Sequence, residues 1–351
     1  MTADGRHIDP ELGALTGEGS LQKIDTTSEA YPTKTSVWRD LPSHSYQEAE
    51  PTYYGRPALK EPVWIWTVPT YFYVGGTAGA AAVLAAAAQA LDAEELHRLV
   101  KASRWVAAVG GALGSALLIT DLGRPERFLH MLRVIRPTSA MSLGSWVLAG
   151  AASSTLGSAL LSDRQGFLGR LGHFAGYTAA LLGMPLSGYT AVLLGNTAVP
   201  VWKAARRGLP PLFIGTSISG LSALFGLLPV VLSPREETIV ERFGIAGKAI
   251  DLIAMTVVER EAERVDPVGR PLREGLSGTL WKAARAMTAA SLALSLLPGR
   301  SRVRRAATGL IGTVGALTLR FAVFHAGKAS ARDPKATFVP QRKRLKEETA
   351  Y

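Results

Sequence analysis

Long apolar segments recur along the middle of this chain and alternate with short polar loops. A stretch of about 20 predominantly apolar residues is long enough to cross a bilayer as a helix. Short loops join neighbouring antiparallel helices, so the pattern predicts an all-α, polytopic membrane protein with about eight transmembrane helices, which we expect to form two four-helix halves. The predicted spans are 63–91, 104–121, 140–162, 172–196, 211–232, 238–258, 276–297 and 304–326.

Polar segments flank this predicted transmembrane domain, which covers residues 63–326. Residues 1–62 are rich in Pro, Ser, Thr and acidic residues, and we expect an extended arm that binds a soluble partner. Residues 327–351 form a basic tail suited to the same partner or to anionic membrane lipid. The first 30 residues contain no apolar core, which argues against a cleavable signal peptide.

The chain has a net charge of +11, but its basic residues lie mostly in short loops. Such a distribution is typical of topology signals rather than of nucleic-acid binding, so we expect no nucleic-acid partner. More Lys and Arg residues fall on the side shared by both termini, which predicts that both termini are cytoplasmic. The chain has no Cys, so it cannot hold an iron–sulfur cluster by thiolate ligands.

Charged residues also occur inside the last three predicted spans. One interpretation is that they face the bundle interior or extend towards the lipid headgroups. The other interpretation is a path for protons or a substrate. The residues concerned are Arg242, Lys248, Asp251, Lys282, Arg285 and Arg320.

Asp121 stands where the second span leaves the apolar region, with Arg124 three residues later. An acidic residue at this depth is costly unless it has a partner or a proton to move. Desolvation favours its neutral form, whereas the nearby guanidinium favours its charged form. Asp121 is therefore either a proton relay or a structural partner of Arg124 that caps the loop.

Several short segments, in this order and spacing, resemble the NrfD/PsrC family, the membrane subunits of polysulfide-reductase-type complexes. The resemblance covers about residues 54–330, and the end of the chain, from Arg320 to Lys335, resembles members encoded beside formate-dehydrogenase-like enzymes. The matching segments are Tyr54-Gly55-Arg56-Pro57, Trp64–Gly76, Asp121–Phe128, Arg136–Trp146 and Tyr189–Trp202.

The resemblance implies an eight-helix protein of the bacterial inner membrane that binds a quinone, either menaquinone or ubiquinone. It also implies a ferredoxin-like iron–sulfur subunit as the electron-transfer partner, connected to a molybdopterin subunit that carries molybdenum or tungsten. The iron–sulfur clusters then belong to the partner, and we expect no haem and no metal site in this chain. His173 and His325 are the only histidines near the spans, and both lie close to span ends.

The resemblance also places three residues around the quinone head: Tyr71, Asp121 and Tyr189. Some members carry His at the position of Tyr71, and a phenol is a poorer proton carrier at neutral pH, so Asp121 is the better candidate for proton transfer. Arg124, Trp146 and Asn196 complete the predicted quinone-binding set. The structural alternatives are an interfacial aromatic belt or core packing for the aromatic residues and a helix end for Asn196.

Two rival functions remain open from the sequence. A proton-coupled transporter would use the charged residues of the last three spans, but its broken helices should recur in two repeats, and no convincing repeat is present. A passive membrane anchor for a soluble enzyme would need no acidic residue inside the membrane. It predicts unchanged turnover after replacement of Asp121 or Tyr71.

Overall fold

The computed structural model describes residues 7–9, 14–16, 57–122, 126, 128–133, 135–136, 138–298 and 301–348, with side chains between residues 57 and 341. The chain divides into two compact units, Met1–Gly55 and Arg56–Tyr351. In the first unit, β1 (His7–Asp9) and β2 (Ala14–Thr16) pair in antiparallel register, with Ile8 opposite Leu15. The rest of the predicted arm up to residue 56 lies outside the described residues.

The second unit is helical, and each predicted span coincides with one long helix within the described residues. The long helices are α1 (Thr67–Asp92), α2 (His97–Asp121), α4 (Ala140–Leu161), α5 (Gly166–Gly195), α7 (Leu209–Leu227), α8 (Pro234–Ala262), α10 (Gly275–Leu296) and α11 (Arg302–Arg332). Short helices lie between or after them: α3 (Phe128–Met131), α6 (Pro200–Ala204), α9 (Asp266–Arg273) and α12 (Pro334–Glu348). The predicted all-α polytopic fold is confirmed.

Five helices in the described part of the chain, α1, α2, α5, α7 and α11, are long and apolar enough to cross a membrane. Helices α4, α8 and α10 are not in this group, and α8 carries Arg242, Lys248 and Asp251. The multi-pass membrane character is therefore established, whereas the number of eight spans stays a prediction.

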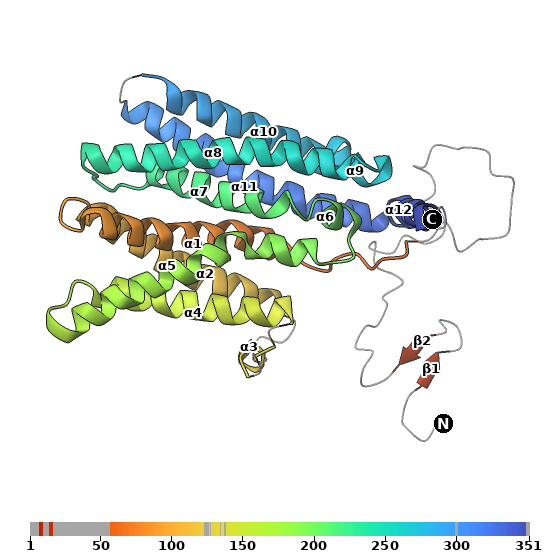
Figure 1. Cartoon of the computed structure of the whole chain (residues 1–351), viewed down its shortest axis with the longest axis horizontal. Helices are drawn as coiled ribbons and strands as arrows, with labels where there is room; N and C mark the ends of the chain where they lie inside the picture. Colours follow the sequence, from red (N-terminus) through yellow and green to blue (C-terminus); the bar gives the residue numbers. More distant parts are fainter. Residues whose placement is uncertain are drawn as a thin grey trace, which may run out of the picture. The chain divides into compact units, whose positions relative to one another are not determined.

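The long helices pack as two groups of four. Helices α1, α2, α4 and α5 form the first half, and α7, α8, α10 and α11 form the second (Figure 1). The halves meet where α7 packs against α1 and α5 and where α11 packs against α1. Helix α1 thus belongs to the first half and also forms one wall of the interface.

Small residues allow the helices of the first half to approach closely. A Cβ atom built on Gly79 of α1 would lie 2.6 Å from the carbonyl oxygen of Gly183 in α5, and one on Gly183 would lie 2.7 Å from the Gly79 oxygen. Such close backbone packing is typical of helices that associate in lipid, where burial of apolar surface provides little drive.

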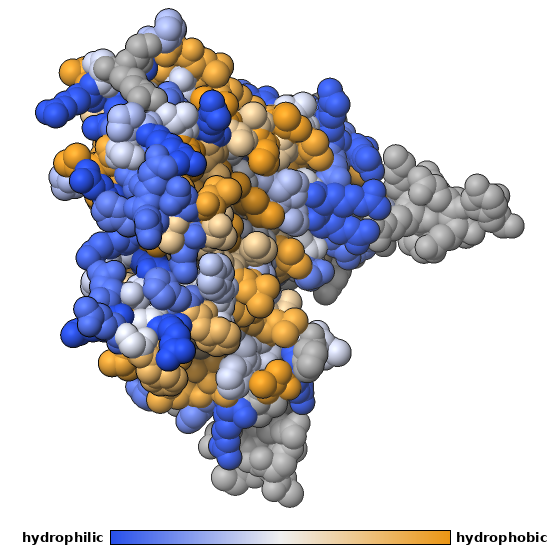
Figure 2. Space-filling model, turned by 60° about the vertical axis from the view of Figure 1, so that its left-hand side comes forward, coloured by the Kyte–Doolittle hydropathy of each residue, from blue (hydrophilic) through white to orange (hydrophobic). Residues whose placement is uncertain are grey.

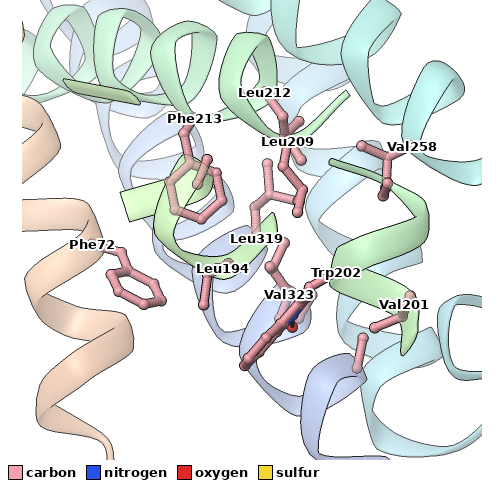
Figure 3. Packing of buried hydrophobic residues seen from close by; sticks show 14 of the residues in the cluster. Phe72, Leu194, Val201, Trp202, Leu209, Leu212, Phe213, Val258, Leu319 and Val323 are labelled. Carbon is pink, nitrogen blue, oxygen red and sulfur yellow. Dashed lines mark hydrogen bonds between the residues drawn. The ribbon is translucent and has the colours of Figure 1, made fainter. Parts of the chain in front are cut away.

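A buried apolar cluster fills the junction between α6, α7 and α11 (Figure 3). Trp202 is 1% exposed, and its Nε1–H donates to the carbonyl oxygen of Val323 at 2.9 Å. Phe213 packs beside Phe72 of α1, with 5.7 Å between ring centroids. Large apolar side chains also remain exposed, such as Phe167 at 72%, and hydrophobic patches cover much of the face in Figure 2, as expected for a surface in contact with lipid.

The two halves are also joined at one end by a buried carboxylate. Ser233 caps α8 in a capping box, in which the Glu236 carboxylate accepts the backbone N–H of Ser233 at 2.7 Å. The other oxygen of Glu236 accepts the N–H of Leu99, near the start of α2, at 2.7 Å. Glu236 is fully buried, so one side chain satisfies the free N–H groups of two helix ends from different halves.

Candidate functional site

The three principal candidates, Tyr71, Asp121 and Tyr189, lie at the same end of the first half. Tyr71 is one turn into α1, Asp121 is the last residue of α2, and Tyr189 lies near the end of α5. Helix α1 runs antiparallel to α2, and α4 runs antiparallel to α5. The start of α1 and the ends of α2 and α5 therefore lie at the same end of the bundle.

Tyr71 is 5% exposed and lies against two glycines. A Cβ atom on Gly75 would lie 2.8 Å from its ring, and one on Gly114 of α2 would lie 3.3 Å from it. The Phe72 ring stands beside it at 6.2 Å in an edge arrangement. The absence of side chains at these glycines lets α1 and α2 enclose the phenol ring.

Tyr189 rests on the backbone of α4. A Cβ atom on Gly144 would lie 2.3 Å from the Tyr189 ring and 2.6 Å from its hydroxyl oxygen. The hydroxyl is buried and lies within hydrogen-bonding range of the Gly144 backbone, but it forms no well-aligned hydrogen bond with the described residues. Tyr71 lies within electrostatic range of Tyr189, and the two phenols occupy the same end of the half formed by α1, α2, α4 and α5.

Asp121 reaches across to the beginning of α1. Its Oδ1 accepts the hydroxyl of Thr67 at 3.1 Å and the N–H of Ile65 at 3.3 Å. Thr67 lies one turn before Tyr71, which connects the half-buried carboxyl group to the same end of the bundle. A helix N-terminus offers unpaired N–H donors and a favourable dipole for such a group. The predicted partner Arg124 lies outside the described residues.

Trp146 and Asn196 are more exposed than the two phenols. Trp146 is 38% exposed on α4. Asn196 is exposed and ends α5, where its backbone N–H donates to the carbonyl oxygen of Val192 at 3.1 Å. Sequence reasoning missed Thr67, Gly114 and Gly144, because their roles come from contacts between helices that no local pattern encodes.

The charged residues of the second half fall into two groups. Arg242 and Lys282 are exposed, and Arg285 forms an ion pair with Glu259 at 2.9 Å. In contrast, Lys248, Asp251 and Arg320 are at most 2% exposed. The first group fits the structural interpretation of these charges, whereas the second group needs a separate explanation.

An open groove lies beside the Asp121 end of α1. It is formed by the segment that precedes α1 and by the connection between α5 and α6, and its lining residues are Lys60, Glu61, Pro62, Val63, Trp64, Thr197, Val199 and Trp202. Trp64 stacks on Trp202, with 6.0 Å between ring centroids. Glu61 pairs with Arg332 at 2.6 Å, which joins this segment to the end of α11.

Comparison with known proteins supports the helical membrane fold. A family model described as polysulfide reductase, of the NrfD type, matches residues 51–332. The match includes all the long helices of both halves. No curated protein matches the chain. Among the described residues, no group of three His, Cys, Asp or Glu side chains is arranged to hold a metal ion.

Proposed function

Because the chain belongs to the polysulfide reductase NrfD family, the membrane subunits of quinone-interacting oxidoreductase complexes, we propose that it binds a quinone at the Tyr71–Tyr189 pair. The observation that carries this proposal is the buried Tyr189 hydroxyl, which has no hydrogen-bond partner among the described residues. A buried polar group of this kind requires a partner, and a quinone carbonyl oxygen accepts a hydrogen bond. The residues present therefore fit a quinone head.

Reduction of a quinone takes up two electrons and two protons, and oxidation of the quinol releases them. The Tyr189 and Tyr71 hydroxyls are hydrogen-bond donors that orient the two-carbonyl ring between α1 and α5. Asp121, at the bundle end, exchanges protons between this site and the membrane surface, with Thr67 between it and Tyr71. The tightly packed glycines hold both phenol rings in place and exclude water from one side.

Electrons would pass between the quinone and a ferredoxin-like iron–sulfur subunit. That subunit would exchange electrons in turn with a molybdopterin subunit that carries molybdenum or tungsten. The lack of Cys supports the placement of all clusters in a partner. Residues 1–62 are the proposed docking arm, and menaquinone or ubiquinone is the proposed electron carrier. The passive-anchor alternative assigns no role to the two phenols.

We place the protein in the bacterial inner membrane with both termini in the cytoplasm. The Glu61–Arg332 and Glu61–Lys328 pairs, at 2.6 and 3.4 Å, support a common side for both ends of the helical unit. The excess of Lys and Arg on that side supports its cytoplasmic location.

The test is to purify tagged protein in mild detergent with its partners and to measure bound quinone, iron, molybdenum and tungsten. Tyr189→Phe is compared with Tyr177→Phe, a control on the same helix whose side chain is 46% exposed. We expect Tyr189→Phe to lower the quinone content and the control to retain it. Equal quinone content in both variants would contradict a quinone at Tyr189.

A further inference from the structure

The second half contains a buried polar cluster that the quinone site does not use. Asp251 and Arg320 are each 1% exposed, and Lys248 is 2% exposed. Burial of charged groups inside a membrane bundle is costly, so they are expected to have a role or a full set of partners. The contacts of each side chain show whether it has a full set of partners.

Asp251 on α8 is held by two hydroxyl groups of α7. Thr216 Oγ1 lies 2.6 Å from its Oδ1, and Ser219 Oγ lies 2.8 Å from its Oδ2. A Cβ atom on Gly215 would approach Oδ1 to 3.1 Å, so the backbone of α7 passes close to the carboxyl group. The site is therefore polar, enclosed and formed by two adjacent helices.

The contacts of Thr216 suit both protonation states of Asp251. Its Oγ1 also lies 2.6 Å from the carbonyl oxygen of Leu212. A hydroxyl group has one proton, so it donates either to the carbonyl or to Asp251. If Thr216 donates to Leu212, the short contact with Asp251 requires a proton on the carboxyl group. If it donates to Asp251, the carboxyl group is charged. The change between the two states takes a rotation of the Thr216 hydroxyl together with the loss or gain of the carboxyl proton.

Arg320 on α11 lies on the other side of α7. Its Nη2 donates to the carbonyl oxygen of Phe213 at 2.9 Å and to Ser217 Oγ at 3.1 Å, and its Cζ lies 3.9 Å above the Phe213 ring. These partners are neutral. Asp251 and Arg320 lie within electrostatic range of each other and both contact hydroxyl groups of α7, but in the described part of the chain they form no direct ion pair.

Several buried polar atoms around Arg320 form no hydrogen bond with the described residues. They are Arg320 Nε, Arg320 Nη1, Tyr73 Oη, Thr77 Oγ1 and Thr313 Oγ1. The Tyr73 hydroxyl lies within hydrogen-bonding range of both threonines and near Arg320, but none of these contacts has the geometry of a well-formed hydrogen bond. Buried polar atoms in native proteins are satisfied by protein or by ordered water. This concentration at the interface of the two halves therefore indicates internal water.

We propose that Asp251 is a buried proton-binding site and that water molecules around Arg320 connect it to Tyr73 on α1. In each exchange the carboxyl O–H bond breaks and a water molecule gains a proton, either directly or through a hydroxyl that accepts the carboxyl proton as it gives up its own, and the charge of Asp251 changes from zero to −1. Arg320 stabilises the charged form across α7. Tyr73 lies two residues from Tyr71, about 200° around α1, so the same helix presents one tyrosine to each half.

Other ionisable groups near Asp251 are few. On α8 itself, Lys248 lies three residues earlier, and its Nζ donates to Ser295 of α10 at 2.7 Å. Arg320 comes from α11 and Tyr73 from α1, whereas α7 contributes hydroxyl groups. Ser295 lies near the C-terminal end of α10. Lys248 therefore lies between the Asp251 cluster and the membrane surface at that end.

Infrared difference spectroscopy of the full chain in lipid nanodiscs, titrated with pH, tests this proposal. A protonated carboxyl group has a C=O stretching band that a carboxylate lacks. We expect a band that weakens as pH rises, that is absent in Asp251→Asn and that moves in Asp251→Glu. Asp163→Asn, which removes an exposed carboxylate paired with Lys101, should leave the band unchanged.

Arg320→Gln provides a second readout, because loss of the positive charge should preserve the carboxyl band to higher pH. A band that persists in Asp251→Asn, or a carboxylate at Asp251 at every accessible pH, would overturn the proposal in favour of a fixed charge pair. If Asp251→Asn fails to fold, Asp251→Glu still decides by the position of its band. The experiment uses quinone-free protein, so its failure leaves the quinone site untouched.

Discussion

Replacement of Gly144 by Ala is the most direct test of the packing that orients Tyr189. The added Cβ would lie 2.3 Å from the Tyr189 ring and 2.6 Å from its hydroxyl oxygen. Carbon atoms in contact are about 3.5–4.0 Å apart, so the ring must move by about 1 Å. The hydroxyl that we assign to the quinone moves with it.

Gly157→Ala is the matched control, because Gly157 lies on the same helix and its Cβ would meet nothing closer than the Ala175 methyl group at 3.7 Å. Both variants gain helix propensity of about 1 kcal/mol, so this contribution cancels in the comparison. Overpacking at position 144 costs about 1–3 kcal/mol. The free energy of unfolding of Gly144→Ala should therefore be about 1–3 kcal/mol below that of the control.

Quinone affinity should change in parallel. A displacement of about 1 Å stretches a hydrogen bond from Tyr189 beyond the useful range, and a neutral hydrogen bond contributes about 0.5–1.5 kcal/mol. The dissociation constant should rise roughly 2- to 10-fold. Unfolding in detergent monitored by tryptophan fluorescence gives the stability, and titration with a soluble quinone gives the affinity. A Gly144→Ala variant that matches the control in both measurements would refute the reasoning.

Two further predictions concern the helix ends. Glu236→Ala leaves the buried N–H of Leu99 and the partly buried N–H of Ser233 without an acceptor, so the free energy of unfolding should fall by about 1–3 kcal/mol for the Leu99 N–H and by less for the other. Glu237→Ala loses a surface pair with Arg305 and should cost about 1 kcal/mol or less in the same thermal unfolding assay. Equal losses would show that Glu236 does not join the helices. Asp121→Asn preserves an oxygen acceptor for Thr67 but removes the titratable group, so quinone turnover of the complex should fall roughly 100-fold with an unchanged unfolding temperature. Undiminished turnover would favour the passive anchor.

The apolar pattern predicts the helices well where composition changes sharply at their ends. The predicted span 140–162 corresponds to α4 at Ala140–Leu161, because Ser139 caps its start. Helix α8 is longer than the predicted 238–258, because its capping box and charged ends extend it beyond the apolar segment. Helix α11 likewise continues past residue 326 to Arg332. Hydropathy detects the membrane portion of a helix, not its full length.

The position of Tyr71, Asp121 and Tyr189 at one end of the first half could be anticipated from the spans and from the antiparallel order of the helices, whereas their role at a quinone site stays a prediction. The cradle at Gly144 and the contact of Asp121 with Thr67 could not be anticipated, because both depend on how helices distant in sequence are rotated against each other. The Asp251 cluster could not be predicted either, because nothing in the sequence distinguishes Thr216 and Ser219 from other small residues of α7.

The carboxylate of Glu236 has a mechanical consequence. Together with Arg235, which pairs with Glu95 and lies 3.6 Å from Asp92, it fastens the start of α8 to the α1–α2 turn. A transporter that alternates access between the two sides of the membrane moves one half relative to the other. Such a movement would separate α2 from α8 at this end and leave the buried N–H of Leu99 without its acceptor. A protein joined in this way has a fixed frame in which only side chains and water need to move, as our proposals for the quinone site and for Asp251 require.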